Sequence, residues 1–250
     1  MQAVENVAFA DGLVKADASD DEKPKTACPG MDSVQLVSRL CNGARFSESS
    51  PTDGSGENHT IIGDPTDSAI LRFAQNVSDT AALVDNHKTL LTIPFNSRVK
   101  RMVSVVKPHN GGAILLVKGA PDQLFDYCTS AIDTEGNEVA FDHAYWSGVQ
   151  HAWAREGQRV LALCRRTLTG LKLHVDNPEM FEQQVEATCI EDLQLVALLG
   201  LRDPPRPDVK AAVTTIRGAH VKIFMVVCLC SQCAWNTCVN LARWFPRADR

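Results

Sequence analysis

Apolar residues recur at helical spacing in several parts of the chain. The clearest stripe follows Asp64-Pro65 and has the i, i+3, i+4, i+7 pattern of one helix face: Ala69, Ile70, Phe73, Ala74 and Val77. An Asp at the cap and a Pro in the first turn favour the start of a helix there. Further helices are predicted to begin at Asp32 or Ser33 (ending at Asn42-Gly43), Ala120, Ala144, Asn177 and Val209.

Shorter apolar runs predict strands over residues 4–9, 90–95, 101–107, 113–118, 159–164, 193–201 and 221–227. His109-Asn-Gly-Gly112 separates two of them and is a good hairpin turn. The polar stretches 10–30 and 47–59 are expected to be loops. This order predicts a hairpin-rich α+β domain. The last fifth of the chain changes to a β-α-β order, which indicates a domain boundary near Asp203.

Composition narrows the class of protein further. The chain has 250 residues, of which 44% are hydrophobic and 22% charged, as in a globular domain with its own core. A net charge of −5 disfavours a nucleic-acid partner. No apolar run reaches the ~18 residues of a transmembrane helix, so we expect the chain alone to be soluble. Its odd number of cysteines, nine, is typical of reduced thiols rather than of a disulfide framework.

Several common site motifs are absent from the sequence. It has no phosphate-cradling Gly-x-x-x-x-Gly-Lys-Ser/Thr, no Gly-x-Gly-x-x-Gly and no Gly-x-Ser-x-Gly. Val117-Lys118 resembles the ATP-binding lysine of protein kinases, but no His-Arg-Asp or Asp-Phe-Gly follows, which disfavours a kinase. Four cysteines lie close together near the end without the paired spacing of a zinc site: Cys228, Cys230, Cys233 and Cys238. No metal site is predicted.

Five segments, in order, carry a resemblance to a known family: Gly63-Asp-Pro-Thr-Asp-Ser-Ala69, Ile93-Pro-Phe-Asn-Ser97 with Lys100, Val117-Lys-Gly-Ala-Pro121, Glu156-Gly-Gln-Arg-Val160, and Asp203-Pro-Pro-Arg206 running on to Val221-Lys-Ile-Phe-Met-Val226. Together they resemble the cytoplasmic nucleotide-binding domain of P-type cation-transporting ATPases, in particular the sodium/potassium-pump branch and its fungal relatives. The resemblance implies a twisted antiparallel sheet with flanking helices over residues 1–202. It also implies a partial phosphorylation-domain segment at 203–227, a short β-α-β remnant, and a divergent tail at 228–250.

The resemblance also implies an ATP site and assigns roles to individual residues. The ring of Phe95 would stack on the adenine, and Lys100 and Lys118 would line the pocket and lean toward the phosphates. Arg159 would donate charge-assisted hydrogen bonds to the phosphates. Gly119, which lacks a Cβ, would let the nucleotide approach the backbone. Asp67 would accept a hydrogen bond from the adenine amino group, although it is one methylene shorter than the glutamate usual in the family.

Two motifs on which the family's reaction depends are missing. The sequence has no Asp-Lys-Thr-Gly-Thr, which supplies the phosphorylated aspartate, and Met225-Val226 leads into cysteines rather than into Thr-Gly-Asp. We therefore expect this chain to begin downstream of the nucleophile and to bind ATP weakly without hydrolysing it or transporting ions. Its partners would be ATP, with Mg²⁺, and the phosphorylation and transmembrane domains of a full pump at the cytoplasmic face of a membrane. The alternative is a non-enzymatic interaction module whose nucleotide site is vacant.

Overall fold

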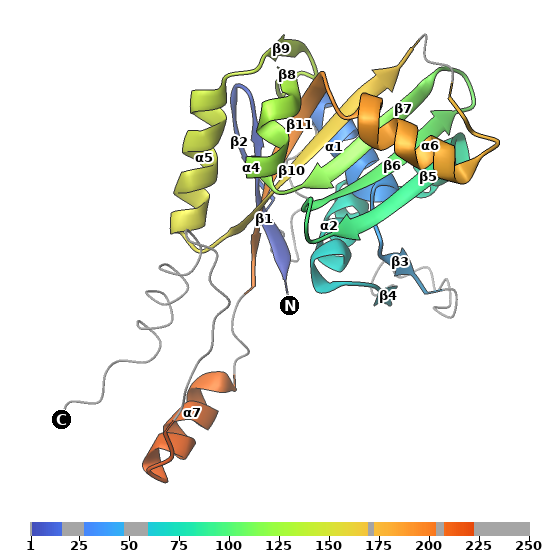
Figure 1. The fold of residues 1–250 in the computed structure, drawn as a ribbon. Helices are drawn as coiled ribbons and strands as arrows, with labels where there is room; N and C mark the ends of the chain where they lie inside the picture. Colours follow the sequence, from blue (N-terminus) through green and yellow to red (C-terminus); the bar gives the residue numbers. More distant parts are fainter. Residues whose placement is uncertain (1, 17–27, 48–59, 170–172, 204–207, 223–250) are drawn as a thin grey trace.

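Within the part of the chain that the structure describes, a mixed sheet of nine strands lies at the centre (Figure 1). The computed structural model describes residues 2–16, 28–47, 60–169, 173–203 and 208–222. Seven of the strands follow one another across the sheet in this order: β2 (Gly12–Lys15), β1 (Ala3–Phe9), β11 (Leu193–Arg202), β10 (Arg159–Leu168), β7 (Ala113–Gly119), β6 (Arg101–Pro108) and β5 (His87–Asn96). All of these neighbours are antiparallel. The predicted α+β class with an antiparallel sheet is confirmed.

One edge of β11 is shared by two strands. Its first residues pair in parallel with β8 (Cys128–Ile132), which forms a hairpin with β9 (Glu138–Ala140), whereas its last residues pair with β1. The strands β3 (Arg45–Phe46) and β4 (Ile61–Ile62) form a separate two-stranded ribbon. The sequence pattern did not predict β3, β4, β8 or β9, because such short strands carry too few apolar positions to show an alternation.

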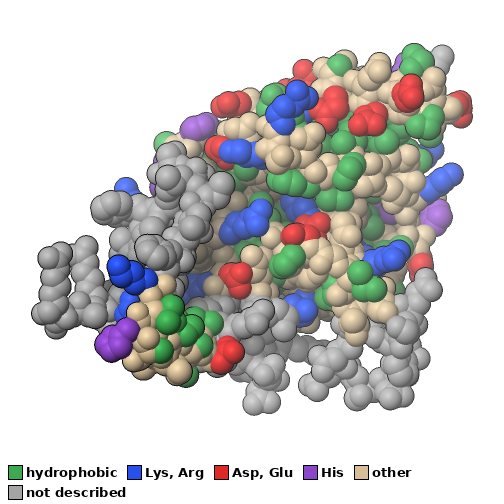
Figure 2. Space-filling model, turned by 60° about the horizontal axis from the view of Figure 1, so that its bottom comes forward, with side chains coloured by type: hydrophobic (Ala, Val, Ile, Leu, Met, Phe, Trp, Pro, Cys, Tyr) green, Lys and Arg blue, Asp and Glu red, His purple; other side chains and the backbone are tan. Residues whose placement is uncertain are grey.

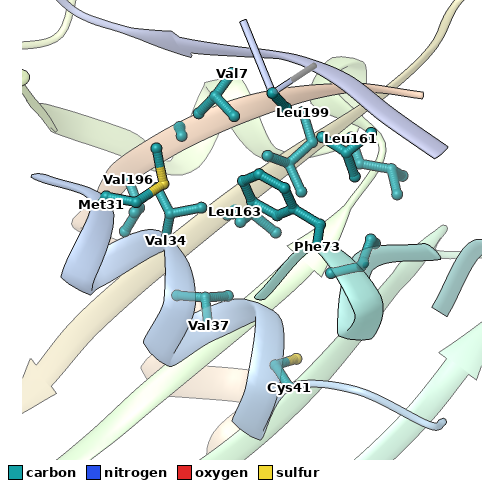
Figure 3. Close-up of a cluster of buried hydrophobic side chains, with 14 of the residues drawn as sticks. Val7, Met31, Val34, Val37, Cys41, Phe73, Leu161, Leu163, Val196 and Leu199 are labelled. Atoms are coloured by element: carbon teal, nitrogen blue, oxygen red, sulfur yellow. The ribbon is translucent and has the colours of Figure 1, made fainter. Parts of the chain in front are cut away.

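Two helices cover one face of the sheet. Figure 3 shows Met31, Val34 and Val37 of α1 (Pro29–Leu40) pointing at strand residues such as Leu163 and Val196. Phe73 of α2 (Pro65–Val77) enters the same cluster from the side. The helical stripe read from the sequence after Asp64 is therefore the face that α2 buries, and the Asp64 carboxylate caps it by accepting from the Thr66 amide.

The helices α4 (Pro121–Leu124), α5 (His143–Arg155) and α6 (Pro178–Gln184) lie on the opposite face. Trp146 and Trp153 of α5 and Phe181 of α6 pack with Val105 and Leu115 of the sheet. The short α4 passes into a 3-10 turn, Phe125–Tyr127, and α6 passes into a π-helical turn, Val185–Cys189. Neighbouring residues of a strand point to opposite faces, so the two clusters are separated by the sheet itself.

Two predictions about the N-terminal third are wrong in detail. Part of the expected loop 10–30 is the edge strand β2, which pairs with β1. The first long helix begins at Pro29 rather than at Asp32 or Ser33, and its cap residue, Cys28, makes no side-chain capping bond. A proline fits the first helical turn, where an amide would lack a partner in any case. The helix α3 (Ala81–Asn86) was not predicted.

The predicted helix near the C-terminus is present as α7 (Val209–Gly218), whose described side chains are half-buried or exposed. Of the strand predicted at 221–227, only the first two residues lie within the described part of the chain. Residues 204–206 of the motif Asp203-Pro-Pro-Arg206 and the four clustered cysteines lie outside it. The proposed division into a domain at 1–202 and a second segment from 203 stays a prediction.

The variants Gly30→Ala and Gly148→Ala together test how closely the start of α1 packs against its neighbours. A Cβ added at Gly30 would lie 2.5 Å from the Asp133 carbonyl oxygen and 2.9 Å from the Phe9 ring, whereas one added at Gly148 meets nothing within 4 Å. We expect Gly30→Ala to lower the free energy of unfolding by about 1–3 kcal/mol. Gly148→Ala, within α5, should raise it by about 0.5–1 kcal/mol. Urea denaturation of both variants checks this, and equal effects would contradict it.

Candidate functional site

The residues predicted to form the site meet at one end of the sheet. The last residues of β5 and β7 and the first residues of β6 and β10 lie side by side there, because these strands alternate in direction. Across that end, Asn96 is opposite Arg101, Arg101 is opposite Gly119, and Gly119 is opposite Ala162. Phe95 precedes Asn96, Lys118 precedes Gly119, and Arg159 begins β10. The strand register thus gathers residues that are more than sixty positions apart in the chain.

Lys118 and Asp67 form a largely buried ion pair between the sheet and α2. The Lys118 ammonium donates to Asp67 Oδ1 at 2.5 Å, and the two side chains are only 6% and 19% exposed. The other carboxylate oxygen, Oδ2, accepts from the Gly43 amide at 2.8 Å. Both residues lie where the sequence predicted a site, but in this structure they bind each other. A charge at so low an exposure is stable only with such a partner.

Lys118 points to the face covered by α1 and α2, as do its register neighbours Met102 and Leu163. The Cys41 thiol lies in the same region, and its Sγ donates to the Met102 carbonyl. Burial raises the pKa of Cys41 to about 11, against the opposing influence of the nearby Lys118 charge. The thiol is therefore neutral at physiological pH, and Asp67 supplies the counter-charge of Lys118.

Arg159 is exposed, and its guanidinium reaches the same turn of α2. Its Nη1 donates to Thr66 Oγ1 at 3.0 Å, and that hydroxyl donates in turn to Gln2 Oε1. The first turn of α2 therefore contacts both Arg159 and Lys118, through Thr66 and Asp67. The sequence did not single out Thr66, although its place one residue before Asp67 in the Gly63–Ala69 motif was the available signal.

The loop that presents Arg159 is anchored by a buried side chain. Gln158 is 3% exposed; its Oε1 accepts from Asn6 and its Nε2 donates to Glu156. A Cβ at Gly200 would collide with Gln158 Oε1, so a glycine on β11 makes room for this anchor. Gly157, at φ +81°, supplies the left-handed turn before it. The motif Glu156–Val160 therefore has a structural role in addition to any role of Arg159.

Lys100 lies in the tight turn between β5 and β6 with φ +50°. Its amide donates to the Asn96 carbonyl at 2.7 Å, which closes the turn. Its ammonium lies 3.6 Å from Asp122 Oδ2, with both side chains about half exposed. A pair this exposed is weak and readily exchanged for another anion.

Gly119 is buried in the sheet rather than presented on a surface. A Cβ there would lie 2.7 Å from the Lys100 carbonyl oxygen and 3.0 Å from the Arg101 Cβ. Close packing of β7 against the start of β6 is thus a sufficient reason for a glycine at this position. Its predicted approach to a nucleotide stays a prediction.

At this end of the sheet, the large apolar side chain of Phe95 is exposed to solvent. It is 55% exposed and lies on β5, the last strand of the sheet, beside a register shift between Ile93 and Asn96. On the face in Figure 2, basic, acidic and hydrophobic side chains are interspersed. That face therefore carries no single broad positive field.

Comparison with known proteins agrees with this architecture. The sequence model of the family described as P-type ATPase, cytoplasmic domain N, matches residues 31–208. The chain belongs to this family of cation-transporting ATPases, as a representative of its N domain.

Its relatives are much longer proteins. It is 29% identical to the rat sodium/potassium-transporting ATPase subunit alpha-4 over 231 residues, and 29% identical to the human potassium-transporting ATPase alpha chain 2 over 234 residues. Both matches cover 87% of this chain and 22% of the relative. The match to calcium-transporting ATPase 1 of Saccharomyces cerevisiae is 28% identical and covers 83% of this chain and 20% of that protein. The chain thus spans about a fifth of the length of these relatives.

The described residues show neither a metal-binding cluster nor a membrane-spanning helix. Within those residues, no group of three or more His, Cys, Asp or Glu side chains is arranged to hold a metal ion. None of the helices over the same part of the chain has the length and apolar character needed to cross a bilayer.

The coupling between Lys118 and Asp67 is measurable by a double-mutant cycle. Asp67→Asn leaves the Lys118 ammonium without its counter-ion, and we expect it to lower the free energy of unfolding by about 2–3 kcal/mol, less than for a fully buried pair because Asp67 retains some contact with water. The double variant Asp67→Asn/Lys118→Met should recover most of this loss. Asp122→Asn, which breaks the exposed pair with Lys100, is the control and should cost less than about 1 kcal/mol. Additive effects of the Asp67 and Lys118 substitutions would contradict the coupling.

Proposed function

We propose that this chain is the ATP-binding part of a P-type ATPase that transports monovalent cations, and that ATP binds at the sheet end formed by Phe95, Lys100, Lys118 and Arg159. The observation that carries the proposal is the exposed ring of Phe95 at the same end as these cations. A purine needs a flat apolar partner, and its phosphates need cationic donors. The choice of monovalent cations rests on the sequence resemblance to the sodium/potassium-pump branch.

The types of residue at this end of the sheet, and their positions, support ATP as the ligand. Phe95 supplies a stacking surface, and Lys100 and Arg159 each engage a partner at the surface that an anion can replace. Lys118 is less available to the nucleotide, because a phosphate would have to compete with the Asp67 carboxylate for its ammonium group. Mg²⁺, which the family uses with ATP, would neutralise part of the triphosphate charge when bound. We assign it no ligand in this chain.

Three contributions to the free energy of binding set the expected affinity for ATP. Stacking on one aromatic ring contributes about 1–3 kcal/mol, and each charge-assisted hydrogen bond about 1.5–3 kcal/mol. Lost translation and rotation cost at least ~4 kcal/mol. A site with one ring and two or three cations, one of them already paired, should bind ATP near millimolar, at about −4 kcal/mol.

In a full-length pump, such a domain would work with a phosphorylation domain and a transmembrane domain from the cytoplasmic side of the membrane. The ATP bound here would deliver its terminal phosphate to an aspartate that this sequence does not contain. The rival function is a non-enzymatic interaction module. The internal pairing of Lys118 with Asp67 favours the interaction module, because a carboxylate of the chain already balances the charge of this lysine.

An ATP titration followed by amide chemical shifts separates the two. We expect saturable shifts that localise near Phe95 and Arg159, with a Kd of the order of 1 mM. Phe95→Ala should weaken binding at least about fivefold, because it removes the stacking contribution. Leu13→Ala is the control, since Leu13 is similarly exposed, at 58%, but lies on β2 at the opposite edge of the sheet. Undiminished affinity of Phe95→Ala would refute the proposed site.

Hydrolysis is a separate question from binding. We expect no phosphate release above background from the purified chain with ATP and Mg²⁺, since it has no Asp-Lys-Thr-Gly-Thr to accept the phosphoryl group. A coupled phosphate assay measures this. Release that the wild-type chain supports and Lys118→Ala abolishes would show the expectation to be wrong.

A further inference from the structure

We infer that Pro94 is a positioning residue for the proposed site, because the one-residue register shift at Pro94 directs the Phe95 ring to the same face of the sheet as Lys118. The inference rests on the proposed function, since it concerns how the stacking ring comes to serve the same ligand as the cations. A base and its phosphates belong to one molecule. The ring and the cations must therefore be accessible from one side of the sheet.

Lys118 and Arg159 lie on the same face of the sheet, the one covered by α1 and α2. Lys118 pairs with Asp67 of α2, and Arg159 donates to Thr66 of the same helix. We call this the α2 face, and we call the opposite one, on which α4, α5 and α6 lie, the α6 face. A ring that stacks on the base of a nucleotide held by these cations has to lie on the α2 face.

Simple alternation along β5 would place Phe95 on the other face. Ile93 lies on the α6 face, because it pairs with Val103 and packs in the hydrophobic cluster of that face. In a regular strand, residues two positions apart point to the same side. Regular pairing beyond Ile93 would therefore turn the Phe95 ring to the α6 face, opposite Arg101.

The strand departs from regular pairing at this point. Between Ile93 and Asn96, β5 advances three residues while its partner β6 advances two. Pro94 and Phe95 therefore share the position opposite Met102, which is the arrangement of a β-bulge. The extra residue reverses the alternation for the remainder of the strand.

The direction of Asn96 shows where the ring of Phe95 points. Asn96 pairs with Arg101, whose guanidinium donates to Glu186 in the π-helical turn after α6. Paired residues of neighbouring strands share a face, so Asn96 lies on the α6 face. Phe95 is its neighbour in the strand and points to the α2 face. Lys118 lies on that face as well, two strands further into the sheet.

Both sides of the bulge are held in register. Toward the turn, the Lys100 amide donates to the Asn96 carbonyl at 2.7 Å and closes the hairpin. Toward the middle of the strand, Leu91 and Ile93 are partly buried against the α6 face. The mismatch of one residue has to be absorbed between these two fixed points, and the residue found there is Pro94.

A proline suits this position for a conformational reason. Its ring holds φ at about −65°, whereas a regular antiparallel strand has φ of about −140°. Its missing amide is tolerated in an edge strand or at a bulge, and β5 ends the strand order of the described sheet. Pro94 thus disfavours the regular pairing that would turn Phe95 to the α6 face.

The test compares two changes at position 94, with the Kd of ATP measured from amide chemical shifts. Pro94→Val introduces a residue that favours a regular strand, and we expect ATP to bind about threefold more weakly because part of the population turns its ring to the α6 face. Deletion of Pro94 removes the extra residue itself, so regular pairing then leaves Phe95 opposite Met102. We expect this variant to keep the wild-type Kd within about twofold. Pro108→Val, at the other end of the same hairpin, is the matched control and should leave the Kd unchanged.

Inorganic tripolyphosphate separates a positioning role from a general loss of structure. It has no base, so its Kd should be the same for wild type and Pro94→Val. In a chain that already carries Phe95→Ala, Pro94→Val should have no effect on ATP binding, because no ring is left to position. Circular dichroism spectra establish that the variants are folded, and the two measurements of this paragraph decide the inference even where the deletion prevents folding.

The outcomes distinguish this inference from the proposed function. Equal ATP affinity of Pro94→Val and wild type, together with weaker binding by Phe95→Ala, would overturn the inference and leave the proposed function intact. The same would follow if Pro94→Val weakened tripolyphosphate as much as ATP, or if a folded deletion variant lost as much ATP affinity as Pro94→Val. Absence of ATP binding by the wild-type chain would overturn the proposed function and the inference with it.

Discussion

The ion pair between Lys118 and Asp67 joins the two halves of the site. One partner lies at the end of a central strand and the other in the first turn of α2, and each is largely withdrawn from water. Neither charge is stable at that depth alone, so each requires the other, and the pair links the first turn of α2 to the end of β7. With Thr66, which accepts from Arg159, it makes the start of one helix the common partner of two cations from different strands.

The sheet makes this arrangement possible. Antiparallel neighbours bring the ends of β5 and β7 beside the beginnings of β6 and β10, and the pleat divides their side chains between two covered faces. Two glycines are also required by this close packing. Gly119 admits the backbone of Lys100, and Gly200 admits the side chain of Gln158. The motifs that carry the family resemblance are thus packing motifs as well as candidate ligand contacts.

Prediction from the sequence succeeded where a pattern was long and local. The stripe after Asp64 and the apolar run 193–201 were each buried as their periodicity indicated, because periodicity reports directly which face an element hides. It failed for α3 and for the short strands β3, β4, β8 and β9, whose conformation depends on a neighbour rather than on their own residues. The start of α1 was misplaced because Pro29 begins it without a capping side chain.

The sequence by itself determined the fold class, the family and the set of candidate site residues, since all three depend on residue types at fixed spacings. Only the tertiary structure decided how those residues are used. Asp67 and Lys118 are separated by fifty positions of chain, and no spacing rule says that they bind each other. The exposure of Phe95 and the depth of Gly119 were likewise decided by which strand lies at the edge and which at the centre of the sheet. Strand order arises from contacts between distant segments, and such contacts leave no local signature in a single sequence.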